Sequence, residues 1–208
     1  SLGNGSSNNT AFVGILGNHG SSPIPSDKIY FNTINIEGVV ASGAQPSFGF
    51  MRGDFTAATR TAPIDFRNNL ITNTRSGGTG SHYAIGDNYG LPSSTTGWGQ
   101  NASNFNVLNA NPATVGWWNS TQTFSGWKSA AACDPYSFSG IAVTYVNPAN
   151  DLHLNMGLTP TYIESGAQNI TAVNADIDNQ NRPGPSGSIN GGAISSDIGA
   201  DEIDAAPI

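Results

Sequence analysis

The chain has few charged residues, few basic ones, a single cysteine and no long apolar run. Charged residues make up 10% of the 208 positions, and 7 Lys plus Arg against 14 Asp plus Glu leave a formal net charge of −7. A protein of this sign repels phosphate backbones, so nucleic acid is not an expected partner. No apolar stretch approaches the roughly 20 residues of a membrane-spanning helix, so we expect no direct membrane insertion. Cys133 lacks a second cysteine for an internal disulfide and is expected to be a small buried hydrophobe.

Glycine and small polar residues take the place of charge. The chain contains 26 glycines set among many Asn, Ser and Thr, and these residues favour frequent turns. Short apolar or alternating segments recur between them, at residues 11–16, 29–40, 48–51, 69–72, 83–85, 105–108 and 141–146. Each segment predicts a short strand. Residues 125–133 alone predict a helix, with Ser125 or Thr123 as its N-cap.

An asparagine precedes three of these segments at nearly regular intervals. Asn32, Asn68 and Asn106 lie 36 and then 38 residues apart. Such a period fits one coil of a solenoid that carries a surface loop. Asparagines at equivalent turns of successive coils can stack into a ladder in which each amide bonds the next. A structural ladder is therefore the leading interpretation, and contact with a surface ligand is the alternative.

Several motifs resemble one family of proteins. They are Ile-Tyr-Phe-Asn-Thr-Ile at residues 29–34, the segments 66–74, 82–85 and 151–154, and a closing pair, Asp-Ile-Asp-Asn-Gln-Asn-Arg-Pro at 176–183 and Asp-Ile-Gly-Ala-Asp-Glu at 197–202. In this order they resemble the secreted right-handed parallel β-helix repeat proteins of Bacteroidota, within the pectate-lyase-like superfamily. Members of that family often carry a C-terminal anchoring or sorting domain.

The resemblance implies a fold class and a location. The expected fold is all-β, a right-handed single-stranded parallel β-helix (a solenoid) with long surface loops and one short helix. Residues 1–175 would form the coils, 176–204 the closing turn and 205–208 the start of a linker. We expect secretion and attachment to the cell surface. We also expect that upstream coils, a cap or a neighbouring chain covers the N-terminal edge, because an unpaired edge is prone to association.

Acidic residues gather near the C-terminus. Asp176, Asp178, Asp197 and Asp201 supply hard oxygen ligands that could hold calcium, the one cofactor that the sequence suggests. The alternative is that Arg182 pairs with one or two of these carboxylates and locks the last turn of the fold.

Catalytic groups are sparse. A lyase that acts on an acidic polysaccharide needs a base and cationic groups that neutralise the substrate carboxylate. Arg67, Arg75, His82 and Asp87 are the best candidates in this chain. No motif places two carboxylates at the spacing that a glycosidase needs.

Aromatic residues suggest a binding role instead. Trp98, Trp117 and Trp118 could stack on sugar rings, and packing in the core is the alternative for each. Trp117 and Trp118 are adjacent, so in a strand one faces inward and the other outward. The sequence thus favours a non-catalytic structural or adhesive surface module that contacts a polysaccharide or another cell-surface component. The alternative is a polysaccharide lyase or glycoside hydrolase that acts on an acidic polysaccharide.

Overall fold

The computed structural model of the chain describes residues 9–17, 27–53, 64–88, 103–157, 159–188 and 194–208. Its strands are β1 (Phe12–Gly17), β2 (Asp27–Tyr30), β3 (Thr33–Ile36), β4 (Val39–Val40), β5 (Ser47–Arg52), β6 (Ile64–Arg67), β7 (Leu70–Asn73), β8 (Ser76–Gly77), β9 (His82–Asp87), β10 (Ser103–Asn104), β11 (Val107–Asn109), β12 (Gly116–Trp118), β13 (Thr121–Gln122), β14 (Tyr145–Asn147) and β15 (Asp151–Leu154). One α-helix, α2 (Phe124–Ala131), lies among the described residues. That helix is too short to cross a membrane.

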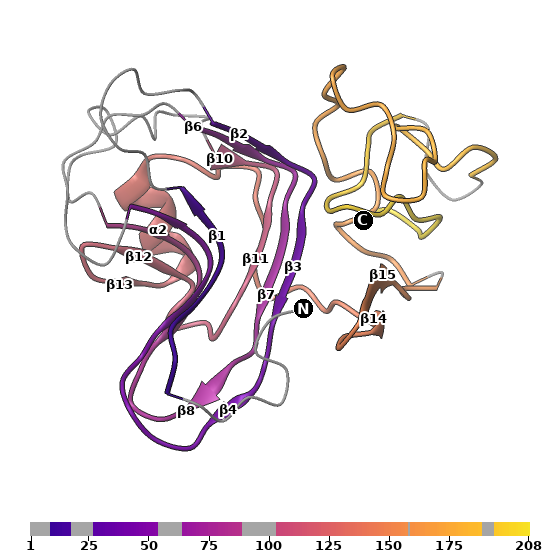
Figure 1. The fold of residues 1–208 in the computed structure, drawn as a ribbon. Coiled ribbons are helices and arrows are strands. Elements are labelled where there is room, and N and C mark those ends of the chain that lie inside the picture. Colours follow the sequence, from indigo (N-terminus) through magenta and orange to yellow (C-terminus); the bar gives the residue numbers. More distant parts are fainter. Residues whose placement is uncertain (1–8, 18–26, 54–63, 89–102, 158, 189–193) are drawn as a thin grey trace.

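The strands form five small sheets. Their orders are β1-β5-β9-β12-β13, β10-β6-β2, β11-β7-β3, β14-β15 and β4-β8. Most neighbours are parallel, and in the β11-β7-β3 sheet Leu70 pairs with Thr33 on one side and Val107 on the other, each 37 residues away. Figure 1 shows these parallel strands side by side, with α2 on one side of them and the C-terminal segment on the other.

The predicted right-handed parallel β-helix is wrong. The strands do not form one continuous solenoid, because β13 returns antiparallel to β12 and α2 follows at once. A second antiparallel pair joins β14 to β15. Beyond β15, the described residues contain isolated bridges but no strand. From Leu154 onward, backbone N–H groups donate to side-chain carboxylates instead of to a neighbouring strand: Leu154 to Asp201, and Ser165 and Ile203 to Asp197. Parallel pairing at an interval of 37 residues therefore does not continue there.

The predicted helix is present, but it begins at Phe124, one residue earlier than predicted, and ends at Ala131, two residues earlier. Thr123 is the N-cap, and its hydroxyl accepts a hydrogen bond from the backbone N–H of Gly126 at 3.2 Å. Trp127 is fully buried and lies against Gly116 of β12, where any Cβ would come within 2.8 Å of the indole. The helix therefore covers the end of the β1-β5-β9-β12-β13 sheet through one aromatic side chain and a glycine that makes room for it.

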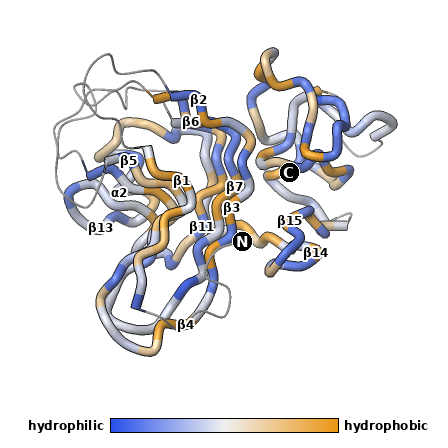
Figure 2. The backbone as a smooth tube through the Cα atoms, in the orientation of Figure 1, coloured by the Kyte–Doolittle hydropathy of each residue, from blue (hydrophilic) through white to orange (hydrophobic). Residues whose placement is uncertain are grey.

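Three hydrophobic clusters form the interior of the described residues, and the smallest consists of Phe48, Met51 and Tyr83. The largest lies between the sheets and α2 and includes Phe50, Phe66, Ile71, Ile85, Leu108 and Trp127. The second joins the β11-β7-β3 sheet to the C-terminal segment and includes Phe31, Leu70, Val107, Ile163 and Ile198. Figure 2 shows hydrophobic and hydrophilic residues interleaved along the strands, as alternation between two faces predicts.

Two hydrogen bonds donated by backbone N–H groups hold the C-terminal segment against residues near the β11-β7-β3 sheet. Gly199 N–H donates to Asn68 O at 2.9 Å, and Ala200 N–H donates to Thr33 Oγ1 at 2.9 Å. Gly199 has a φ of +109°, and any Cβ there would lie 2.9 Å from Thr33 Oγ1. This close approach requires a glycine and holds the segment at a fixed place on the sheet.

Candidate functional site

A row of three polar side chains crosses the β11-β7-β3 sheet. Asn35 pairs in register with Thr72, and Thr72 pairs with Asn109. The residue before each one packs in or against the hydrophobic core: Ile34, Ile71 and Leu108. Because successive side chains of a strand point to opposite faces, the polar row lies on the face away from that core. We call Asn35, Thr72 and Asn109 the inner row.

The inner row forms hydrogen bonds with residues 141–148, which form one wall of a groove and which we call the wall segment. Asn35 Nδ2 donates to Pro148 O at 3.2 Å, and Asn109 Nδ2 donates to Ile141 O at 2.6 Å. Thr72 Oγ1 and Tyr145 OH share a hydrogen bond of 2.9 Å. Burial raises the pKa of Tyr145 to about 12, so its hydroxyl stays protonated at neutral pH. The wall segment has no strand before β14, and these bonds replace a sheet ladder in fixing its path.

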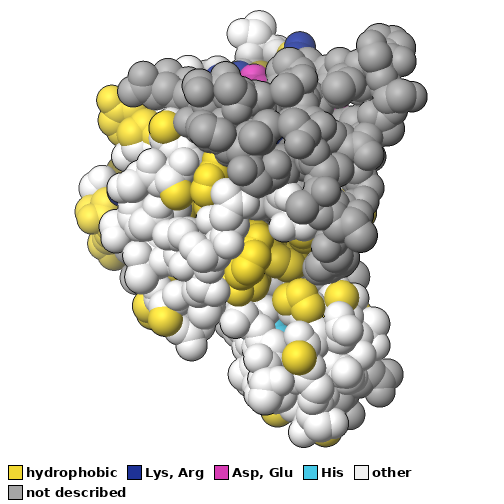
Figure 3. Space-filling model, turned by 90° about the vertical axis from the view of Figure 1, so that its left-hand side faces the viewer, with side chains coloured by type: hydrophobic (Ala, Val, Ile, Leu, Met, Phe, Trp, Pro, Cys, Tyr) yellow, Lys and Arg dark blue, Asp and Glu magenta, His cyan; other side chains and the backbone are white. Residues whose placement is uncertain are grey.

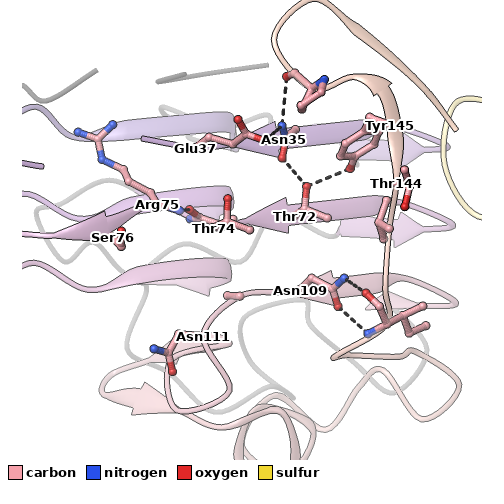
Figure 4. A pocket seen from close by; sticks show the side chains of 15 residues that line it. Asn35, Glu37, Thr72, Thr74, Arg75, Ser76, Asn109, Asn111, Thr144 and Tyr145 are labelled. Carbon is pink, nitrogen blue, oxygen red and sulfur yellow. Dashed lines mark hydrogen bonds between the residues drawn. The ribbon is translucent and has the colours of Figure 1, made fainter. Parts of the chain in front are cut away.

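A second row lies just beyond the three strands, since β3 ends at Ile36, β7 at Asn73 and β11 at Asn109. Glu37, Thr74 and Asn111 follow the inner row by two positions and line the same groove. Thr74 N–H donates to Ile36 O at 2.9 Å, which continues the parallel pairing to this level. Thr74 and Asn111 are exposed and Glu37 is half-buried. This outer row presents a carboxylate, a hydroxyl and an amide to a ligand (Figure 4).

The two rows and the wall segment enclose an open groove of about 630 Å³. Apart from the rows, its lining includes Arg75, Ser76, Ile141, Val143, Thr144 and Tyr145. Glu37 and Arg75 are the charged residues of the lining, so their formal charges cancel. The groove therefore combines hydroxyl, amide and phenol groups with aliphatic surface, a set that suits a neutral ligand rich in hydroxyl groups.

No protein-family model, curated protein or solved structure matches this chain.

Arg67 and Arg75, the two predicted catalytic arginines, have different surroundings. Arg67 is bound by Asp65, with both Nε–Oδ1 and Nη2–Oδ2 at 2.5 Å, and Arg67 Nη1 donates to Gln168. Arg75 is buried, and its guanidinium carbon lies 4.2 Å from the ring centre of Phe12. Arg75 lines the groove, and Arg67 does not.

His82 and Asp87, the other two catalytic candidates, are buried in β9. His82 Nδ1 lies 3.0 Å from Ser47 Oγ, and burial together with the charge of Arg75 lowers the pKa of His82. Asp87 Oδ2 accepts a bond from Arg52 Nη1 at 3.3 Å. Neither lines the groove, so the structure does not bring the four predicted catalytic residues into one site.

Two of the four predicted calcium ligands, Asp176 and Asp197, accept hydrogen bonds from backbone N–H groups, and the other two lie near a histidine. Asp197 accepts backbone N–H bonds from Ser165 and Ile203, both at 2.6 Å, and burial raises its pKa to about 9. Asp176 accepts backbone N–H bonds from three residues: Asp178, Gln180 and Glu202. Asp178 and Asp201 instead lie near each other and near a histidine, His153, that the sequence did not single out.

Arg182 lies at the centre of the closing turns. It forms a fully buried ion pair with Glu202 and donates to the carbonyls of Asp197 (3.3 Å) and Gly199 (2.9 Å). Its guanidinium carbon lies 4.1 Å from the ring centre of Phe31. Arg182 Nε also donates to the carbonyl of Ala175 at 3.3 Å, so this one side chain joins its own turn to residue 175 and to residues 197–202 of the strand-free segment.

The three tryptophans of interest have different places. Trp118 is buried and packs against Trp127, with ring centres 5.9 Å apart. Trp117 is half-buried on the outer side, where its ring contacts Tyr83 at 5.8 Å, and Tyr83 stacks on Phe48 at 4.9 Å. Figure 3 shows hydrophobic side chains gathered on this side of the molecule. Trp98 lies outside the described residues.

The asparagine ladder is present, but its middle member is Asn69 and not the predicted Asn68. Asn32, Asn69 and Asn106 bond one another at intervals of 37 residues. Asn68 instead bonds Gln168, with its side-chain Nδ2 donating to the Gln168 carbonyl at 2.7 Å. A search at a constant spacing of 37 would have found Asn69, and also both rows of the groove.

Proposed function

We propose that this chain is a non-catalytic extracellular module that binds an extended, neutral glycan along the groove. The observation that carries the proposal is the in-register inner row, with the outer row two residues beyond it, beside the wall segment. Neighbouring strands lie roughly 4.8 Å apart, so three strands repeat the polar groups over roughly 10 Å. The step of roughly 4.8 Å between neighbouring strands is close to the advance of one pyranose unit in an extended chain, so successive sugars would meet equivalent donors and acceptors.

The two rows have different surroundings, and this difference supports the proposal. The inner row is committed to the wall segment through three hydrogen bonds. In the outer row, Thr74 and Asn111 are exposed and so available to a ligand, whereas Glu37 is half-buried. The cancelling charges of Glu37 and Arg75 favour a neutral sugar over a polyuronate, and the net charge of −7 acts in the same direction.

A lyase or hydrolase is the competing function, and one observation favours it. Glu37 and Arg75 line the same groove, so an acid–base group and a cation are available there. Asn35 Nδ2 donates to Glu37 Oε1 at 2.7 Å, which favours the ionised carboxylate. Among the described lining residues no second carboxylate stands opposite Glu37, as a glycosidase mechanism needs.

The test is calorimetric binding of purified protein to a panel of neutral and acidic oligosaccharides, followed by assays of the same samples for unsaturated products and new reducing ends. We expect saturable binding of a neutral glycan without turnover. The double variant Thr74→Ala/Asn111→Ala should weaken binding roughly tenfold, since each lost hydrogen bond contributes about 0.5–1.5 kcal/mol. The exposed Thr171→Ala serves as the matched control and should bind like the parent. Turnover that Glu37→Gln abolishes would establish the enzyme instead, and unchanged binding by the double variant would place the glycan elsewhere.

A further inference from the structure

Three metal-ligating side chains converge away from the groove. His153, Asp178 and Asp201 place their nearest ligand atoms within 4.8 Å of one another. His153 belongs to β15, whereas Asp178 and Asp201 come from two separate turns of the C-terminal segment. We call these three residues the histidine–carboxylate cluster. An imidazole within the cluster distinguishes it from a surface group of acids.

The carboxylate of Asp151 orients the imidazole of His153. Asp151 Oδ1 lies 2.5 Å from His153 Nδ1, which leaves Nε2 as the ring atom aimed at the cluster. Histidines that ligate metals are usually held this way by a carboxylate on the opposite nitrogen. His153 Nε2 is itself shielded from solvent and makes no hydrogen bond to any described residue, although Asp178 Oδ2 lies 3.1 Å away. This ring nitrogen and the Asp178 carboxylate oxygen are close enough to ligate one metal ion together.

Hydrogen bonds to the backbone also position the residues of the cluster. Leu154 N–H donates to Asp201 Oδ2 at 2.8 Å, whereas Asp178 is held through its own backbone N–H, which donates to Asp176 Oδ1 at 2.9 Å. A carboxylate offers about four acceptor sites, so one such bond leaves capacity for a metal. A hollow of about 250 Å³, lined in part by Asp151, His153 and Asp201, adjoins the cluster and offers room for coordinating water.

We propose that the histidine–carboxylate cluster binds a divalent transition-metal ion of the zinc class. Imidazole nitrogen and carboxylate oxygen are ligands that Zn²⁺ accepts at tetrahedral sites, with water completing the set. Calcium prefers oxygen ligands alone, so His153 argues against the calcium that the acidic residues suggested. The ion would join β15 to two turns of a segment that has no strand of its own, and so would stabilise that segment.

The test uses the full chain after chelator treatment, with Zn²⁺ alone and Co²⁺ alone as probes. We expect one equivalent of Zn²⁺ to bind, the melting temperature to rise, and Co²⁺ to show visible absorption from an imidazole-containing site. His153→Ala and Asp178→Asn should lower the Zn²⁺ affinity at least tenfold. Asp151→Asn keeps all three ligands but loses the orienting contact, so a drop of about 10–100-fold is expected.

Two further measurements keep the test decisive. The side chain of Asp178 is 50% exposed, so Asp178→Asn should fold even if His153→Ala does not, and circular dichroism would check both. Glu37→Gln removes a carboxylate of the groove and should leave Zn²⁺ binding unchanged. The proposal is overturned if no equivalent of Zn²⁺ binds, if Asp178→Asn binds like the parent, or if Ca²⁺ binds to the cluster in place of Zn²⁺ and Co²⁺.

Discussion

Asn69 Oδ1 accepts two hydrogen bonds from Asn32, one from the backbone N–H at 3.0 Å and one from Nδ2 at 2.8 Å. Asn106 Oδ1 receives the equivalent pair from Asn69, at 2.8 and 3.2 Å. The residue before each asparagine has a positive φ: Phe31 (55°), Asn68 (62°) and Phe105 (56°). A positive φ is costly for a phenylalanine, so the ladder stabilises a tight turn that the backbone would otherwise avoid.

Replacing the middle member of the ladder should therefore cost more than replacing an exposed asparagine. Asn69→Ala leaves the Asn32 N–H and two carbonyls without their partners, and we expect a loss of about 2–3 kcal/mol in the free energy of unfolding. Urea denaturation measures this loss. Asn155→Ala, at an exposed position, is the control and should change stability by less than about 0.5 kcal/mol. Equal effects of the two substitutions would contradict a structural ladder.

Two of the arginine ion pairs should contribute very differently to stability. Arg182→Ala leaves Glu202 buried without its cation and removes three bonds to carbonyls, so we expect a loss of about 3–5 kcal/mol in the free energy of unfolding. Arg67 pairs with Asp65 near the surface, and Arg67→Ala should cost no more than about 1 kcal/mol. Equilibrium unfolding of both variants gives the comparison. A smaller loss for Arg182→Ala than for Arg67→Ala would show that the closing turns do not depend on this arginine.

His82 should make the protein less stable in acid. Burial, with the charge of Arg75, lowers the pKa of His82 in the folded state. The unfolded chain then binds the proton more readily, so the contribution of His82 is complete above its unfolded pKa of about 6.5 and is lost as the pH falls through the folded value. His82→Asn should flatten this part of the decline, measured as urea midpoints at pH 7.5 and pH 5. Parallel declines in the parent and the variant would exclude His82 as the cause.

Cys133 should be inert in the native protein. The residue is buried, and burial together with the neighbouring Asp134 raises the pKa of its thiol well above the usual value. Since the thiolate is the reactive form, labelling with a thiol reagent at pH 8 should be at least about tenfold slower in the folded protein than in denaturant. Comparable rates in the two states would show that the thiol is accessible.

Local features were predictable because they depend on neighbours in the chain. The helix follows from Thr123 and the alanines after it, and most short apolar segments became strands. Residues 141–146 were an exception, since strand β14 begins only at Tyr145. Side chains of a distant sheet, above all Asn109, hold that stretch in an irregular path. A contact between residues 32 apart leaves no mark in local periodicity.

Composition and short-range pattern by themselves determined the many short strands, the helix at Phe124–Ala131 and the buried cysteine of the described residues. Tertiary structure alone decided that the strands divide into small sheets, that Asn69 rather than Asn68 joins the ladder, and that His153 meets Asp178 and Asp201. A one-residue change of register moves a side chain to the opposite face of a strand. Residues far apart in the chain are brought together only by packing and by the hydrogen bonds of the turns, so neither result follows from local sequence.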